Sequence, residues 1–483
     1  MNRSDRIRSN SFLVAALALA GLLAGGCVVD QKKEVATYRK VLDGKNPPRV
    51  TYTAPEPLTL EATLLLANRN DEILASSGED YLQSLINKER AFSTFLPTIS
   101  FAPTYNWVDK RGRSFTGAPV KQGVTDAPIT SRYNVFNGFQ DYYNYQAVGY
   151  TIEQRKAQLL DLQQTTLLNV AQTYYTVLTA ERSVQVLLNS TQVQNERVRD
   201  MEGRQRAGVA RPLDVAQTEA NAAATRVQLI QAQNNVRDAR IMLAFLTDAP
   251  VQDAPLADRL VVPDNLPSAD DSLKLAESTR QDIQAAEASI ESFRQLVNAA
   301  IGQYYPSVTL NVDYFLHKES FPTFSEWSGI VQLSTPIFTA GQIEANVRTA
   351  WSQLRQAWLN ANHTRRLVSE QVRTAYENLQ ASNRRIVELR VEVAAAQEAY
   401  RQAQQTYTAG LATNLDVLTA QDALLSSQLS LANEEFNYKL FYLQLLRSMG
   451  RLARPDSPLP PPGAPASQPS PAEVETPRLN TPR

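Results

Sequence analysis

The chain has 483 residues and is nearly neutral, with 48 Lys and Arg against 49 Asp and Glu and a formal net charge of −1. It contains no block of basic residues, so nucleic acid is not an expected partner. Its single cysteine excludes an internal disulfide framework and a cysteine-based zinc site.

Residues 1–26 have the organisation of a secretory signal peptide. Three arginines precede a short apolar stretch over residues 12–23, and small residues follow it up to Cys27. The stretch is too short for a stable membrane span. Because the small residues end in a cysteine, the segment resembles the bacterial lipobox, in which Cys27 becomes the lipidated first residue of the mature chain. Val28 in the next position favours delivery to the outer membrane. An ordinary signal peptide is the alternative.

A polar segment and a first structural repeat follow. Residues 28–57 contain four prolines, which predicts an extended N-terminal arm on the surface. The first repeat is predicted over residues 58–250. It opens with a helix that reaches about residue 91, for which Thr59 is a suitable N-cap.

Two pairs of segments then alternate strictly between apolar and polar residues. This pattern predicts strands at 98–108 and 127–137, and again at 307–316 and 326–338, each with one apolar and one polar face. Strands of about 9 to 11 residues suit a membrane β-barrel, although a half-buried sheet in water would show the same pattern. Four strands cannot close a barrel, which needs about eight, so the chain is expected to assemble with copies of itself around a cyclic axis.

Two very long helices are the second unusual feature. Neither residues 141–204 nor residues 342–405 contain proline, and at 1.5 Å per residue each stretch would be about 95 Å long. Shorter partner helices, at 213–246 and 415–449, are expected to return antiparallel to them. Helices of this length with modest apolar stripes are expected to pack as coiled coils against neighbours.

The turns between the helices occur in two copies. The first tip, 204–214, contains A-G-V-A-R-P-L-D-V, and the second tip, 406–416, contains A-G-L-A-T-N-L-D-V, with their glycines and aspartates at one common offset. A period of about 200 residues is too long for a solenoid, so the chain is two copies of one large unit. A linker, 251–270, precedes the second repeat, 271–450. The proline-rich segment 454–483 is predicted to be disordered.

The tip residues have clear structural roles. Gly208 and Gly410 suit the left-handed residue that ends a helix, and Pro212 suits the first position of the next helix. In the second copy, Thr413 or Asn414 would cap the helix. The aspartates that follow would lie in the first helical turn, where the helix dipole favours a negative charge.

The sequence offers no catalytic site. The chain has two histidines and neither belongs to a cluster of metal-ligand residues. No phosphate-binding glycine loop, nucleophile elbow or dinucleotide fingerprint is present. We therefore expect neither an enzyme nor a bound cofactor or metal.

These motifs, in this order and duplicated, resemble the TolC-like outer-membrane channel family. Residues 58–62 and 70–73 resemble its first helix, residues 305–310 its strand entry, and the two Gly-x-Ala-x-x-x-Asp-Val tips its periplasmic hairpin ends. The resemblance implies a mainly α fold and a homotrimer, with a twelve-stranded β-barrel in the outer membrane and a periplasmic tunnel of helices. It also implies a passive conduit of a tripartite efflux or type I secretion system, which docks onto a periplasmic adaptor linked to an inner-membrane pump. A periplasmic coiled-coil scaffold or adhesin lipoprotein is the alternative.

The resemblance also implies roles for individual residues. Tyr407 and Asp416 match positions near the family's periplasmic gate, where three copies of Asp416 would form a carboxylate ring that attracts cations. Tyr407 could equally be a packing aromatic. Ala412 stands where the family has a basic gate residue, and Thr419 stands where it has a second acidic gate residue. Fewer charged interactions would therefore hold the gate closed. The residues implied to contact the adaptor are Arg206, Gly208, Ala210, Asp214, Gly410, Ala412 and Asp416.

Overall fold

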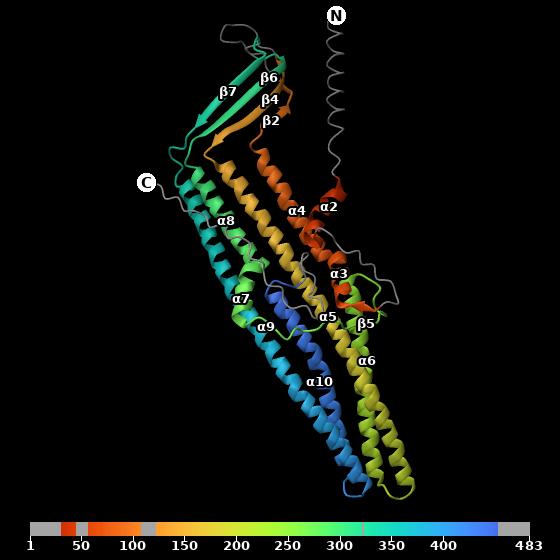
Figure 1. The fold of residues 1–483 in the computed structure, drawn as a ribbon. Coiled ribbons are helices and arrows are strands. Elements are labelled where there is room, and N and C mark those ends of the chain that lie inside the picture. Colours follow the sequence, from red (N-terminus) through yellow and green to blue (C-terminus); the bar gives the residue numbers. More distant parts are fainter. Residues whose placement is uncertain (1–29, 45–56, 108–121, 321–322, 453–483) are drawn as a thin grey trace, which may run out of the picture.

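A computed structural model describes residues 30–44, 57–107, 122–320 and 323–452 of the chain. The molecule is elongated, with a sheet at one end and two helical hairpins that reach the other end (Figure 1). The predicted signal peptide, Cys27 and the segment 454–483 lie outside the described residues.

The hairpins are built on two helices of equal length. Helices α5 (Gln140–Arg206) and α9 (Gln342–Thr408) each contain 67 residues, which corresponds to about 100 Å. Helices α6 (Pro212–Thr247) and α10 (Asn414–Ser448) return antiparallel to them. The predicted fold, in which long antiparallel helices accompany a small sheet, is confirmed.

Shorter helices occupy the half of the molecule nearer the sheet. They are α3 (Leu60–Asn70), α4 (Glu72–Ser93), α7 (Ala269–Thr279) and α8 (Gln281–Gly302). Helix α4 lies along α5, and α8 lies between α5 and α9. The helix expected over residues 58–91 is thus divided in two. The division lies at Asp71, whose backbone is extended and whose side chain accepts a hydrogen bond of 2.7 Å from the backbone N–H of Leu74.

The same division occurs in both repeats and lies against the end of a hairpin helix. In the first repeat Asn70 donates a hydrogen bond of 2.8 Å to the carbonyl of Thr247, at the end of α6. In the second repeat Thr279 donates to the carbonyl of Met449, just beyond α10. Each short helix pair therefore stacks on the end of one returning helix, which preserves the duplication in three dimensions.

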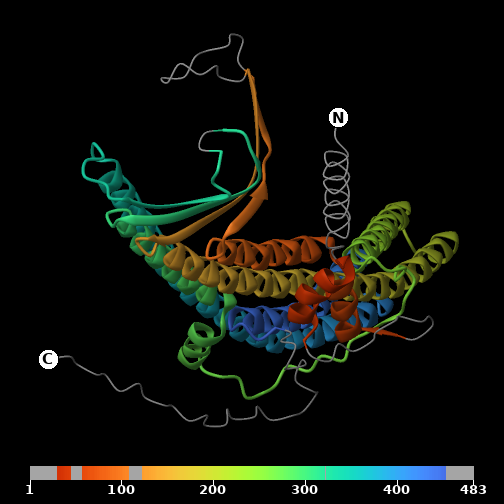
Figure 2. The ribbon, with the colours of Figure 1, turned by 90° about the horizontal axis from the view of Figure 1, so that it is seen from above.

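The sheet is antiparallel and contains strands from both repeats. Its strands are β2 (Thr98–Phe101), β3 (Thr104–Trp107), β4 (Gly123–Asn137), β6 (Ser307–Lys318) and β7 (Trp327–Ser334). The order is β2-β4-β6-β7, and β3 also pairs with β4. Viewed from above, the strands follow an arc over the helices (Figure 2). A separate parallel pair joins β1 (Leu58–Thr59) to β5 (Leu256–Ala257).

The first predicted strand, 98–108, is interrupted. Strands β2 and β3 pair with the same partner in one continuous register, from Thr98 opposite Arg132 to Trp107 opposite Gly123. The interruption contains Pro103, which has no N–H to donate to the ladder. Strand β4 begins earlier than predicted, at Gly123, and β7 ends earlier, at Ser334, two residues before a proline.

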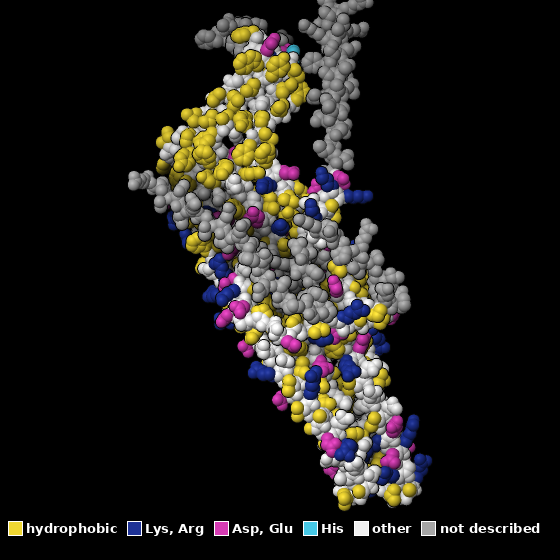
Figure 3. Space-filling model, viewed as in Figure 1, with side chains coloured by type: hydrophobic (Ala, Val, Ile, Leu, Met, Phe, Trp, Pro, Cys, Tyr) yellow, Lys and Arg dark blue, Asp and Glu magenta, His cyan; other side chains and the backbone are white. Residues whose placement is uncertain are grey.

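Apolar side chains are exposed over the sheet. Ile99 is 72% exposed, Trp107 64%, Val331 72% and Leu333 67%. Figure 3 shows hydrophobic side chains gathered over the strands, whereas charged side chains are scattered over the helices. Among the described residues, no helix combines the length and the hydropathy that crossing a bilayer would require.

The expectation of an extended arm over residues 28–57 is wrong for its first part. Helix α2 (Gln31–Asp43) forms there, capped by Asp30, whose side chain accepts hydrogen bonds from the backbone of Lys32 and Lys33. Its buried Tyr38 and Leu42 pack against three apolar residues of α4 and α5, namely Leu74, Tyr81 and Leu159. Tertiary burial of these two side chains outweighs the polar composition of the segment.

Candidate functional site

The two tips are ended by the same backbone motif. Gly208 and Gly410 both have positive φ angles, of 76° and 75°. At the first tip the N–H of Gly208 bonds to the carbonyl of Gln205, and at the second the N–H of Gly410 bonds to that of Tyr407. The next residue in each copy bonds five residues back, which completes a Schellman motif. Glycine is needed here because an L side chain is strained at this φ.

The helix that leaves the second tip is capped reciprocally by Thr413 and Asp416. The backbone N–H and the hydroxyl of Thr413 each lie 2.7 Å from Oδ2 of Asp416, and the N–H of Asp416 donates back to the Thr413 hydroxyl at 3.3 Å. These bonds lower the pKa of the Asp416 carboxyl from its usual value. Asp416 is exposed and accepts these bonds within its own tip.

The first tip uses its aspartate differently. Asp214 is largely buried and accepts both the backbone N–H of Arg211, at 3.2 Å, and its guanidinium, at 3.0 and 2.8 Å. Hydrogen bonding to Arg211 lowers the pKa of the Asp214 carboxyl. The two aspartates are thus equivalent in sequence, but one is held by a charged partner and the other only by a threonine.

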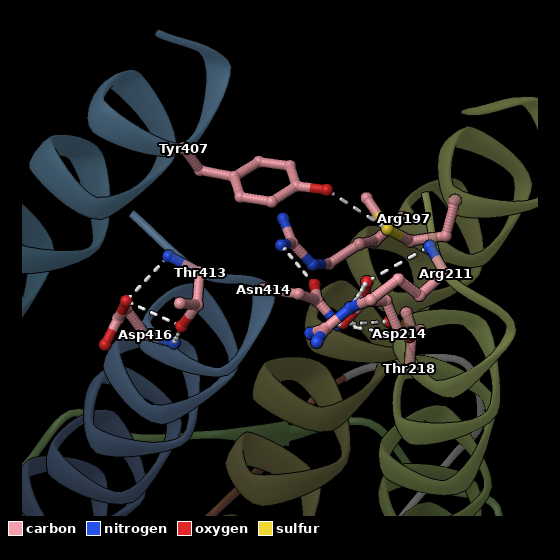
Figure 4. A network of polar contacts seen from close by, with 9 residues as sticks. Arg197, Arg211, Asp214, Thr218, Tyr407, Thr413, Asn414 and Asp416 are labelled. Carbon is pink, nitrogen blue, oxygen red and sulfur yellow. Dashed lines mark hydrogen bonds and ion pairs between the residues drawn. The ribbon is translucent and has the colours of Figure 1, made fainter. Parts of the chain in front are cut away.

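One side chain connects the two hairpins at their tips. Asn414, the first residue of α10, is 3% exposed and reaches α5 and α6 (Figure 4). Its Oδ1 accepts a hydrogen bond of 2.7 Å from the guanidinium of Arg197. Its Nδ2 donates to the carbonyl of Asp214 at 3.1 Å and to the hydroxyl of Thr218 at 3.0 Å. We call the set Arg197, Asn414, Asp214 and Thr218 the inter-hairpin latch.

Tyr407 adds a second connection beside the latch. Its hydroxyl lies 3.4 Å from Sδ of Met201, and its ring lies 5.3 Å from the Arg197 guanidinium and 5.2 Å from that of Arg204. The two cations are therefore attracted by the same aromatic ring. Burial lowers the pKa of Arg197, and its guanidinium faces the Tyr407 ring and Oδ1 of Asn414.

The structure places the predicted site residues in different surroundings. The structure brings Asp214 to the contact between the hairpins through Asn414, and Tyr407 through Arg197. Asp416 lies in the same tip but is bonded to Thr413. Three further predicted residues, Arg206, Ala210 and Ala412, lie at or near the surface of the tips, and Arg206 donates to the carbonyl of Glu202 at 3.3 Å.

Sequence reasoning missed the residues that join the hairpins. Asn414 carried one signal, because it occupies the repeat position of Pro212, which cannot donate a side-chain hydrogen bond. Arg197 carried none, since arginines are frequent along these helices and pair both within a helix, as Arg204 does with Asp200, and between helices, as Arg385 does with Glu434. No His, Cys, Asp and Glu group suited to a metal ion occurs in the described ranges.

Each tip also presents two exposed apolar side chains. Val209 and Leu213 are 73% and 55% exposed at the first tip, and Leu411 and Leu415 are 83% and 60% exposed at the second. These positions are equivalent in the two repeats. Both tips therefore expose apolar side chains at the end of the molecule.

The chain matches a family of known proteins along most of its length. The family model described as outer membrane efflux protein matches residues 81–248 and 272–451. Among similar proteins are the outer membrane efflux protein BepC of Brucella suis biovar 1, 26% identical over 82% of this chain and 86% of the relative, and the outer membrane protein TolC of Escherichia coli, 24% identical over 80% and 81%. The crystal structure of the outer membrane protein VceC of Vibrio cholerae has the same fold, with a TM-score of 0.74 at 21% identity over 81% of this chain and 96% of that one.

Proposed function

This chain belongs to the outer membrane efflux protein family, and from that premise we propose that three copies of it form a conduit that a periplasmic adaptor and an inner-membrane pump open. It is an outer-membrane efflux channel with a periplasmic extension, and it is not an enzyme. The strands of the three copies would together line the passage through the outer membrane, and the helices would enclose the passage through the periplasm.

The proposed gating depends on the inter-hairpin latch. The gate is closed when Asn414 holds the α9–α10 hairpin against α5 and α6 through three hydrogen bonds. The bond to the charged Arg197 contributes about 1.5 to 3 kcal/mol and each of the two neutral bonds about 0.5 to 1.5 kcal/mol, so the latch can keep a tip closed and still be broken by a binding partner. This latch replaces the charged links that are missing at Ala412 and Thr419.

Tyr407 and Asp416 take complementary roles in the proposed gate. Tyr407 supports the latch by attracting Arg197 and Arg204 to the faces of its ring. Asp416 is exposed and free of a cationic partner within its tip, so three copies around an axis would give the narrow end of the conduit a negative ring. Such a ring favours cations in the pore.

The adaptor would engage the tips. Val209 and Leu213 at one tip, and Leu411 and Leu415 at the other, offer apolar contacts that are otherwise exposed to water. The polar and basic residues around them, including Arg206, would surround these contacts. Binding there could supply the free energy that breaks the latch, because the tips and the latch belong to the same helix ends.

Lipidation of Cys27 would attach the mature N-terminus to the membrane. The proposal rests on the signal-like segment that ends in Cys27, and Val28 after it favours delivery to the outer membrane.

Conductance of the purified protein in a planar bilayer tests the proposed function. We expect a small conductance for the wild type and a larger one for Asn414→Ala. A protein that passes no current in either form, or after removal of the tips, would instead be a periplasmic scaffold or adhesin.

A further inference from the structure

The contact between the two hairpins changes in character along its length. Far from the tips, one apolar cluster contains buried residues of all four hairpin helices, including Tyr174, Leu243, Leu379 and Leu443. Closer to the tips a small apolar layer joins Leu187 of α5, Ala232 of α6 and Leu425 of α10. We call this the Leu187 layer.

Between the Leu187 layer and the latch lie buried polar groups that lack a protein hydrogen-bond partner. Gln194 of α5 is 1% exposed, and neither atom of its amide is bonded to a described residue. Gln421 of α10 is 5% exposed, and its Oε1 is also unbonded there. The same holds for Oγ1 of Thr191 and Nε of Arg197. In sequence these groups lie from Leu187 up to and including the latch residue Arg197 of α5, or between the latch residue of α10 and Leu425.

Such groups act against the closed arrangement. A buried amide without a partner has lost its hydrogen bonds to water and has gained none in exchange. Separation of the hairpins would hydrate both glutamines and restore those bonds. At the Leu187 layer separation would expose apolar surface instead, which is unfavourable. Hydration therefore favours separation of the hairpins at the two glutamines and opposes it at the Leu187 layer.

We propose that Gln194 and Gln421 bias the contact between the hairpins toward separation, and that the separation stops at the Leu187 layer. The inference rests on the proposed gate and specifies where it pivots. The latch at the tip holds the biased stretch closed. The moving part of α5 then extends from Leu187 to the tip, about 30 Å at 1.5 Å per residue.

Hydrogen exchange of the purified full-length protein in detergent micelles tests this inference directly. In the double variant Gln194→Leu and Gln421→Leu, the unpaired amides are replaced by apolar groups of similar size. We expect backbone amides of residues 190–200 and 415–424 to exchange at least tenfold more slowly than in the wild type, because the closed contact no longer contains these unpaired amide groups. Amides of residues 167–178 should be unchanged.

Two further samples complete the test. Gln192→Leu is the matched control, since Gln192 is exposed on the same helix, and it should leave the exchange of both segments unchanged. Gln194→Met with Gln421→Met, whose side chains are closer in shape, gives the same readout if the leucine variant folds poorly. Equal or faster exchange in the double variants overturns the inference.

Conductance separates this inference from the proposed function. On the background of Asn414→Ala, the double glutamine variant should lower the current toward the wild-type value. Current in all forms with unchanged exchange would refute the glutamine bias and leave the channel intact. Slower exchange with no current in any form would support the bias and refute the channel.

Discussion

Asn414 and Pro212 occupy the same position in the two repeats, but Asn414 accepts a 2.7 Å hydrogen bond from Arg197 across the boundary between the hairpins. Pro212 is the first residue of its own helix, where its missing N–H is not needed. At this position of the duplicated tips, only the second repeat supplies a side chain that bonds to the other hairpin.

Replacing the latch residue should open the gate. In Asn414→Ala the Arg197 guanidinium, the Asp214 carbonyl and the Thr218 hydroxyl lose a partner, so we expect a free energy of unfolding about 1 to 3 kcal/mol lower. Single-channel conductance should rise in a planar bilayer. The control is Asn235→Ala, because Asn235 is exposed and bonds only within its own helix, to Gln231. Equal conductance in the wild type and Asn414→Ala would refute the latch.

The ring of Tyr407, and not its hydroxyl, should matter for closure. Tyr407→Phe keeps the face that attracts Arg197 and Arg204 and removes only the 3.4 Å contact with Met201. Its conductance should stay close to that of the wild type. Tyr407→Leu removes the cation–π attraction, about 0.5 to 2 kcal/mol for each pair, and should conduct more. Equal effects of the two changes would favour a packing role alone.

The Asp416 carboxylate should set ion selectivity over a wide pH range. Its pKa is lowered by Thr413, so the carboxylate is charged at any pH above the usual value of 3.8. The contribution of its charge to selectivity and to capping is complete above that value and is lost as the pH falls through the lower native pKa. Reversal potentials in a salt gradient should show constant cation preference from about pH 8 to pH 5. Asp416→Asn should reduce this preference throughout, and an unchanged reversal potential would refute the ring.

The two faces of the sheet should differ in their tolerance of charge. Val331 is 72% exposed on the apolar face, and an arginine facing lipid costs about 2 to 4 kcal/mol near the middle of a bilayer. Val331→Arg should therefore lower the amount of trimer recovered from the outer-membrane fraction. Gln332→Arg, one residue along the same strand and on the opposite face, is the control and should be recovered normally. Similar recovery of both variants would contradict the assignment of the membrane face.

Mass spectrometry of the mature N-terminus tests lipidation. We expect the chain to begin at Cys27 and to carry a mass increment for acyl groups. Cys27→Ser should lack this increment and should accumulate with its leader uncleaved. A mature chain that begins at another residue with an unmodified Cys27 would favour the ordinary signal peptide.

The sequence determined the repeated architecture of this protein. Periodicity and the absence of proline predicted the long helices, because an uninterrupted helix needs only local hydrogen bonds. Positive φ at Gly208 and Gly410, and the cap of Thr413, also followed from local chemistry. Alternation predicted the strands and their exposed apolar face, although it did not predict the interruption near Pro103.

Only the tertiary structure decided which distant segments come into contact. Helix α2 forms where polar composition suggested an extended chain, because Tyr38 and Leu42 pack against an apolar surface of α4 and α5. Likewise, Arg197 and Asn414 lie 217 residues apart in sequence, and no local pattern relates them. Local sequence fixes how each hairpin begins and ends, whereas the contact between hairpins depends on how two long helices are aligned by packing far from the tip.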